Sequence, residues 1–200
     1  MPKISMARKR FITKNFLSGA VIIASIVISM IMVRRGENPQ TDPFSAIGAE
    51  NRILFIFWGS TTGAAVYLNL RLLATRLNVQ SKIFQIVLAV GCSMAIVTSI
   101  VLGMDTLRRV IHVGSAMIFG IVCVLCLLFL MIVKLKRKNK RLSATYITAM
   151  AIAGLIFILT SIYVGWFTAF TQIILSNVCL VAMFCSNFIE KWPDQTLDKE

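Results

Sequence analysis

The stretch VIHVGSAMIFGIVCVLCLLFLMIV, Val110–Val133, decides the fold class of this chain. It contains one histidine and no Lys, Arg, Asp or Glu. A helix of about 20 apolar residues, rising ~1.5 Å per residue, crosses the ~30 Å hydrocarbon core of a bilayer. Because the run lacks the alternation of a barrel strand, it is predicted to be a transmembrane helix.

Five further apolar runs share these properties. The 200 residues are 58% hydrophobic and 14% charged, which is more apolar than a typical soluble domain. The expected spans are residues 16–33, 53–70, 83–103, 110–133, 144–164 and 167–189. No linker divides the chain, so residues 1–200 are predicted to form one integral membrane domain, an all-α bundle of six transmembrane helices.

The last uncharged stretch is divided into two spans because it is too long for one. No charged residue occurs from Ala144 to Ile189, and a single helix of that length would reach roughly 69 Å, more than one bilayer. The segment VGWFT, Val164–Thr168, is the predicted turn, because Gly165 loosens the helix and Trp166 suits the membrane interface. The first run has no small-x-small cleavage site after it and is expected to be a retained span.

The distribution of basic residues predicts the orientation. Of the 21 Lys and Arg residues, 16 fall in the two tails and the two connections on the same side, and 5 on the other side. The positive-inside rule therefore places both termini in the cytoplasm, in a multi-pass protein of the plasma membrane. The basic segment Lys134–Arg141 is expected to lie on anionic lipid headgroups, and membrane lipids rather than nucleic acid are the expected partners.

The five cysteines all fall within predicted spans. Cys123 and Cys126 have redox-motif spacing, but no positive charge lies nearby to favour a thiolate, so they are interpreted as packing residues. With one histidine and no acid near the thiols, neither a metal site nor a cofactor is expected. Small residues spaced four apart, such as Gly59 and Gly63, are expected to mark helix contacts within the monomer.

The candidate site lies at the start of the fourth span. Asp105, Arg108, Arg109 and His112 are separated by three, one and three residues, which places them on one stripe of a helix. Asp105 is predicted to cap this helix and to pair with one of the arginines, with His112 about one turn further in.

Two interpretations of this cluster remain open. One is a capped helix end whose arginines extend to lipid headgroups and whose histidine bonds a neighbouring helix. The other is an outward-opening pocket in which Arg108 and Arg109 hold an anionic headgroup or carboxylate and His112 is a donor or a pH-sensitive switch. The first outer loop is expected to close over it through Asp42, Glu50, Asn51 and Arg52, with a short helical turn in SAIGAENR, Ser45–Arg52.

A short motif in the fourth span resembles a known signature. It consists of His112, Ser115, Ala116 and Phe119. It is similar to the H-x-x-G-A…F pattern of the six-span superfamily that contains the damage-regulated autophagy modulators and the FGF-receptor-activating protein, with Ser115 in place of the glycine. Ser45 and Gly48 resemble the Ser-x-x-Gly outer loop of related bacterial six-span proteins. The resemblance implies a six-helix bundle with an outer-face motif and no established reaction.

Three functions follow from these expectations. The first is a non-enzymatic membrane modulator that handles a lipid or small ligand at the outer leaflet. The second is a small transporter or flippase, for which Gln172, Ser176 and Asn177 supply the central polarity. The third is a membrane enzyme using His112 with one of the outer carboxylates, but no activated nucleophile is visible and no catalytic residue is assigned.

Overall fold

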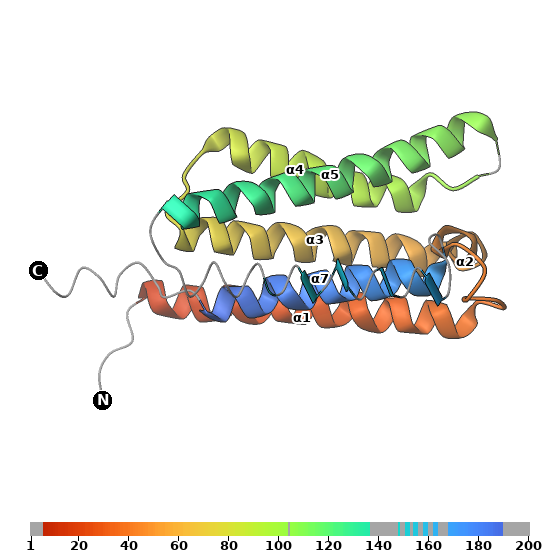
Figure 1. Cartoon of the computed structure of the whole chain (residues 1–200), viewed down its shortest axis with the longest axis horizontal. Helices are drawn as coiled ribbons and strands as arrows, with labels where there is room; N and C mark the ends of the chain where they lie inside the picture. The colour runs from red at the N-terminus through yellow and green to blue at the C-terminus, as the bar shows by residue number, and fades with distance from the viewer. Residues whose placement is uncertain are drawn as a thin grey trace, which may run out of the picture.

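The computed structural model describes residues 6–103, 105–136, 148, 151–152, 154–155, 158–159, 162–163 and 168–189. These residues contain helices and connections and no strand, which confirms the all-α class. The helices are α1 (Met6–Arg35), α2 (Phe44–Glu50), α3 (Arg52–Arg76), α4 (Lys82–Ile100), α5 (Thr106–Lys136) and α7 (Ala169–Ile189) (Figure 1).

Four of the described helices are long and apolar enough to cross a membrane, which makes this a membrane protein by length and composition. They are Thr13–Arg35, Arg52–Arg76, Lys82–Ile100 and Thr106–Val133. The described apolar part of α7, Ala169–Cys185, is shorter. Most of the expected fifth span, most of the expected turn at Val164–Thr168 and the side chains of the basic segment Lys134–Arg141 lie outside the described residues.

The long helices run up and down along one another. α1 ends, α3 begins, α4 ends, and both α5 and α7 begin at the end of the bundle where α2 lies, here called the α2 end (Figure 1). α3 packs against α1, α4 and α7, and α4 packs against α5. α1 begins and α7 ends at the opposite end (Figure 1).

The connection from α3 to α4 is built from local capping. Asn78 has a φ of 50°, a left-handed conformation that asparagine tolerates better than most residues. This turn lets Val79 N–H donate to the Ala74 carbonyl at 2.8 Å, which closes the end of α3 as a Schellman motif does. Ser81 then caps α4, because its Oγ accepts from Phe84 N–H at 3.3 Å.

Glycine allows α3 and α4 to approach closely. A Cβ on Gly63 would lie 2.7 Å from the backbone oxygen of Cys92, and one on Gly59 would meet the side chain of Ser99. The predicted small-residue contact is therefore confirmed for this pair of helices. Gly120 on α5 differs, because open space surrounds the position of its Cβ among the described residues.

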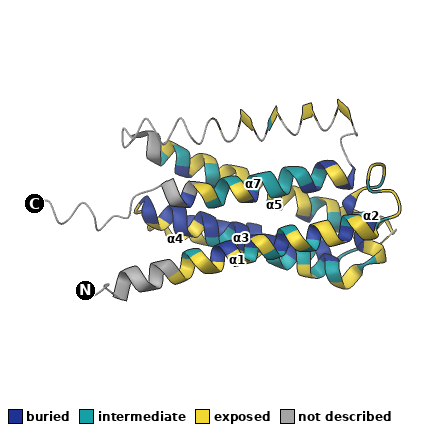
Figure 2. Ribbon diagram, turned by 90° about the horizontal axis from the view of Figure 1, so that it is seen from below, coloured by how far each residue is buried: buried dark blue, intermediate teal, exposed yellow. Residues whose placement is uncertain are grey.

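Burial divides the bundle into a core and an apolar exterior (Figure 2). Within the most apolar 18 residues of each helix, 44% of the residues are buried in α3 but only 11% in α5. The outward face of α5 presents large apolar side chains such as Leu107, Val110 and Ile121. An apolar face of this extent suits contact with lipid rather than with water.

Candidate functional site

A cavity of about 910 Å³ opens near the α2 end. Its lining comes from five helices and from the link between α4 and α5, and it is mostly apolar. The lining residues used below are Phe44, Phe55, Trp58, Thr62, Thr98, Leu102, Arg109, His112, Met117, Phe119 and Gln172. This volume lies in the upper part of the range of ligand pockets, about 300–1,000 Å³.

His112 lies in the wall of this cavity and is fixed by one hydrogen bond. Its Nδ1 lies 2.8 Å from the backbone oxygen of Thr98. A carbonyl only accepts, so Nδ1 carries the proton. In the neutral ring, Nε2 is then an acceptor, and none of the residues that the structure describes donates to it.

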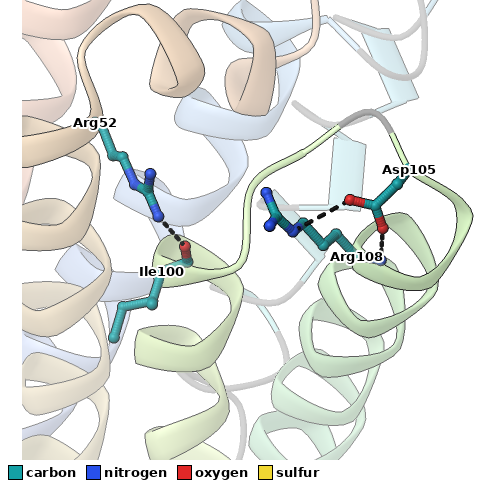
Figure 3. A network of polar contacts seen from close by, with 4 residues as sticks. All are labelled: Arg52, Ile100, Asp105 and Arg108. Atoms are coloured by element: carbon teal, nitrogen blue, oxygen red, sulfur yellow. Dashed lines mark hydrogen bonds and ion pairs between the residues drawn. The ribbon is translucent and has the colours of Figure 1, made fainter.

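The bond to His112 also completes the end of α4. The last carbonyls of a helix have no partner within the helix. The Thr98 carbonyl accepts from His112, and the Ile100 carbonyl accepts from Arg52 Nη2 at 3.3 Å (Figure 3). Two side chains from neighbouring helices, α5 and α3, therefore close the C-terminus of α4.

Two hydroxyls beside His112 bond to each other. Thr98 Oγ1 and Ser115 Oγ are 2.7 Å apart. Each also lies within hydrogen-bond distance of a carbonyl of its own helix, Thr98 of Met94 at 2.8 Å and Ser115 of His112 at 3.0 Å. The hydroxyl of Ser115, which stands where the resembling motif has glycine, thus joins α5 to α4.

Asp105 caps α5, as the sequence predicts. Its Oδ1 accepts from Arg108 N–H at 2.9 Å, and its Oδ2 lies 3.1 Å from Arg108 Nε (Figure 3). Both side chains are more than half exposed. The carboxylate is therefore occupied by the helix start and by Arg108, and neither residue lines the cavity among the described lining residues.

Arg109 differs from its neighbour. Its backbone N–H donates to the Asp105 carbonyl at 3.0 Å, which continues the helix start. The residue lines the cavity, and its guanidinium forms no ion pair with any residue that the structure describes. Of the two adjacent arginines, Arg108 is paired with Asp105 outside the cavity, and Arg109 is a cation at the cavity wall without an ion-pair partner among the described residues.

The loop before α2, which the sequence predicts to be the first outer loop, binds the start of α7 through its backbone. The carbonyl of Asp42 accepts from Ala169 N–H at 2.7 Å, and that of Pro39 accepts from Phe170 N–H at 3.2 Å. Thr168 adds a side-chain cap, accepting from Thr171 N–H at 3.3 Å. These bonds satisfy the first backbone donors of α7 and attach the loop before α2 to the start of that helix.

An aromatic cluster forms one wall of the cavity. The Phe55 and Trp58 rings are stacked, with centroids 5.5 Å apart and planes at 10°. Phe44 from α2 meets Trp58 edge-on at 4.7 Å. The expectation that SAIGAENR forms a short helix is confirmed by α2, but sequence reasoning interpreted Trp58 as a residue of the interface belt and did not single out the two phenylalanines.

The structure brings two of the seven candidate residues into the cavity wall, Arg109 and His112. Asp105 and Arg108 pair beside it, and Arg52 caps α4. The other two, Asp42 and Glu50, belong to the outer loop and the end of α2 and are absent from the described lining. Within the described ranges, no three His, Cys, Asp or Glu side chains are grouped to hold a metal ion.

Buried polar pairs continue beyond the cavity. Thr62 lies in the cavity wall, and its Oγ1 is 2.6 Å from Ser25 Oγ on α1. Toward the opposite end, Asn187 on α7 donates through Nδ2 to Asn69 Oδ1 on α3 at 2.8 Å. These residues are almost fully buried, so they are interhelical bonds sealed inside the bundle.

A search of protein-family models, of curated proteins and of solved structures finds no match to this chain.

Proposed function

We propose that this protein is a non-enzymatic membrane protein of the plasma membrane whose cavity binds an anionic amphiphile, such as a lipid, from the outer leaflet. One observation carries the proposal. Arg109 is a cation without a described partner at the wall of an otherwise mostly apolar cavity, and His112 adds a free ring nitrogen beside it. A pocket with an apolar lining and few polar groups suits a ligand with a long apolar part and one charged end.

Six crossings with both termini in the cytoplasm complete the proposal. α5 ends at the end of the bundle opposite the start of α7 (Figure 1). We infer that the chain between them returns across the membrane over residues 144–164, which gives six crossings if α7 also spans the bilayer beside the four longer apolar helices. The α2 end, with the cavity, would then face outward, as the distribution of Lys and Arg also predicts.

Arg109 explains the preference for an anion. A guanidinium binds carboxylate or phosphate through charge-assisted hydrogen bonds. Arg109 is itself exposed, so its bonds to an anion are partly screened where water or headgroups reach it. Arg108 does not compete for the same ligand, since Asp105 already holds it.

An enzymatic role has less support in the geometry. His112 is oriented by a backbone carbonyl, and no carboxylate of a described residue bonds to it. Asp105, the nearest acid in sequence, is engaged with Arg108 and with the start of α5. Binding and presentation of a ligand therefore fit the site better than acid–base chemistry.

Native mass spectrometry of the protein purified in a mild detergent tests this proposal. We expect co-purifying anionic lipid or fatty acid with the wild type, and a marked loss of it in His112→Ala and Arg109→Gln. Unchanged co-purifying ligands in both variants would overturn the proposal. Arg108→Gln is the matched control, because it removes the same charge one residue away.

Transport is a second candidate, favoured by the buried polar pairs below the cavity. Thr62 and Ser25 continue from the cavity wall toward the Asn69–Asn187 pair. These groups are sealed by one another in this conformation, so passage would need a second one. Uptake of a labelled anionic lipid by reconstituted vesicles, abolished by Asn187→Leu but not by the exposed change Val110→Leu, would support transport; binding without uptake would exclude it.

Membership of the superfamily that contains the damage-regulated autophagy modulators remains part of the proposal. Its support is the motif beginning at His112. His112 and Ser115 each form a bond between α5 and the end of α4. The His112 bond supplies a structural reason for the histidine of the motif, whereas the Ser115 bond belongs to a position where the motif has glycine.

A further inference from the structure

The state of His112 limits what the cavity accepts. Nδ1 is a donor because its partner, the Thr98 oxygen at 2.8 Å, can only accept. The opposite nitrogen, Nε2, is therefore an acceptor in the neutral ring, and no described residue satisfies it. A ligand that covers Nε2 binds more weakly if it leaves this acceptor unpaired, and binds more tightly if it brings a hydrogen-bond donor.

The neighbouring hydroxyls are unsuitable partners for the ligand. Thr98 and Ser115 bond to each other at 2.7 Å and to carbonyls of their own helices. Their protons are already used within the protein. The hydroxyl oxygens can still accept, but among the acceptors of this region Nε2 of His112 is the one to which no described residue donates.

The order of the groups along α5 sets the order of the groups on the ligand. Arg109 lies nearer the α2 end, and His112 follows three residues later, about 4.5 Å along the helix. Met117 and Phe119, further along the same helix, belong to the apolar lining. A ligand entering from the α2 end therefore meets a cation, then an acceptor, then an apolar wall.

We infer that the ligand is an anionic amphiphile with a hydroxyl between its charged group and its apolar chain, the hydroxyl donating to Nε2 of His112. This inference rests on the proposed binding of an anionic amphiphile at Arg109. A fatty acid hydroxylated near its carboxylate has this order of groups, and so does a phosphate ester of a hydroxylated lipid. The shared chemistry is an anion, a nearby hydroxyl donor and one apolar tail.

Two probes that differ by one oxygen test the inference. The full-length protein in detergent is titrated with tetradecanoate and with 3-hydroxytetradecanoate at about pH 8.5, well above the usual pKa of a carboxylic acid. One added hydrogen bond predicts about three- to tenfold tighter binding of the hydroxylated acid by the wild type. A third arm, a phosphate monoester with the same chain and hydroxyl, distinguishes a carboxylate ligand from a phosphate ligand.

Two variants separate the roles of the ring nitrogens. His112→Asn keeps a donor near the position of Nδ1, facing Thr98, but has no group at the position of Nε2. The variant should therefore bind the two acids with about equal affinity. His112→Gln places an amide oxygen near Nε2 and should keep part of the preference. Thermal unfolding of both variants checks that they are folded.

The outcomes distinguish the two proposals. Equal affinity of the wild type for both acids, with binding still weakened by Arg109→Gln, overturns the hydroxyl inference and leaves the proposed function standing. A preference that survives unchanged in folded His112→Asn also overturns the inference. Failure of the wild type to bind either acid or the phosphate monoester, or binding indifferent to Arg109→Gln, overturns both.

Discussion

Nδ1 of His112 lies 2.8 Å from the backbone oxygen of Thr98, so that the start of α5 is bound to the last turn of α4. This one bond has two consequences. It satisfies a carbonyl that the helix end would leave unpaired, and it turns the free nitrogen of the ring into an acceptor. The two interpretations that the sequence leaves open, a structural histidine and a ligand-binding one, are therefore compatible, because each uses a different nitrogen.

Removal of this bond should weaken the bundle. We expect His112→Ala to lower the free energy of unfolding by about 0.6–1.7 kcal/mol, as for other interhelical hydrogen bonds in membranes. Unfolding in mixed micelles of increasing denaturing detergent measures it. Val110→Ala is the control, since Val110 is largely exposed on the same helix and should change stability by less than about 0.5 kcal/mol. Equal effects of the two changes would contradict the structural role of His112.

The cap at Asp105 predicts a difference between two substitutions. Asp105→Ala removes the acceptor for Arg108 N–H and should cost about 1 kcal/mol. Asp105→Asn keeps the cap and loses only the exposed ion pair with Arg108, so its cost should stay below about 0.5 kcal/mol. The same unfolding measurement compares them. If both variants lost equal stability, the ion pair rather than the cap would be the stabilising feature.

Packing between α3 and α4 predicts a strong effect at one glycine and none at another. Gly63→Ala places a methyl group 2.7 Å from the Cys92 backbone oxygen and should destabilise the protein by about 1–3 kcal/mol. Gly120→Ala has open space among the described residues and should be neutral or slightly stabilising. Thermal unfolding of the two variants in detergent checks this. A neutral Gly63→Ala would show that the helices are not in such close contact.

Orientation is tested by labelling in intact cells. A membrane-impermeant maleimide should modify Glu37→Cys, in the loop beside α2, and should modify Lys138→Cys only after permeabilisation. The wild type, whose own cysteines fall within the apolar helices, supplies the background. Labelling of Lys138→Cys in intact cells would contradict cytoplasmic termini. Labelling of both positions from outside would contradict the proposed number of crossings.

Features that depend on residues close together in the sequence were predictable from it. The all-α class follows from uninterrupted apolar runs, and the Asp105 cap, its pairing with one of the two arginines and the short α2 follow from local spacing. The glycine contact of α3 was also predictable, since close helix approach needs small residues.

Features that depend on helix register were not predictable. The sequence places Thr98 and His112 on different helices and does not say which carbonyl meets the ring. Likewise, Asp105 could pair with either arginine, and the choice of Arg108 leaves Arg109 at the cavity wall without an ion-pair partner in the described part of the chain. The aromatic wall of Phe44, Phe55 and Trp58 joins α2 to α3, so its signal in sequence is the spacing of Phe55 and Trp58 on one helix face alone.

The most direct test of the central claim is the affinity of the full-length protein for tetradecanoate, compared between Arg109→Gln and Arg108→Gln. The two substitutions remove the same charge from adjacent positions, one at the cavity wall and one paired with Asp105 outside it. We predict about tenfold or greater weakening for Arg109→Gln, because a charge-assisted bond is lost, and a change within about twofold for Arg108→Gln. Equal affinities of the two variants would contradict an anion site at Arg109.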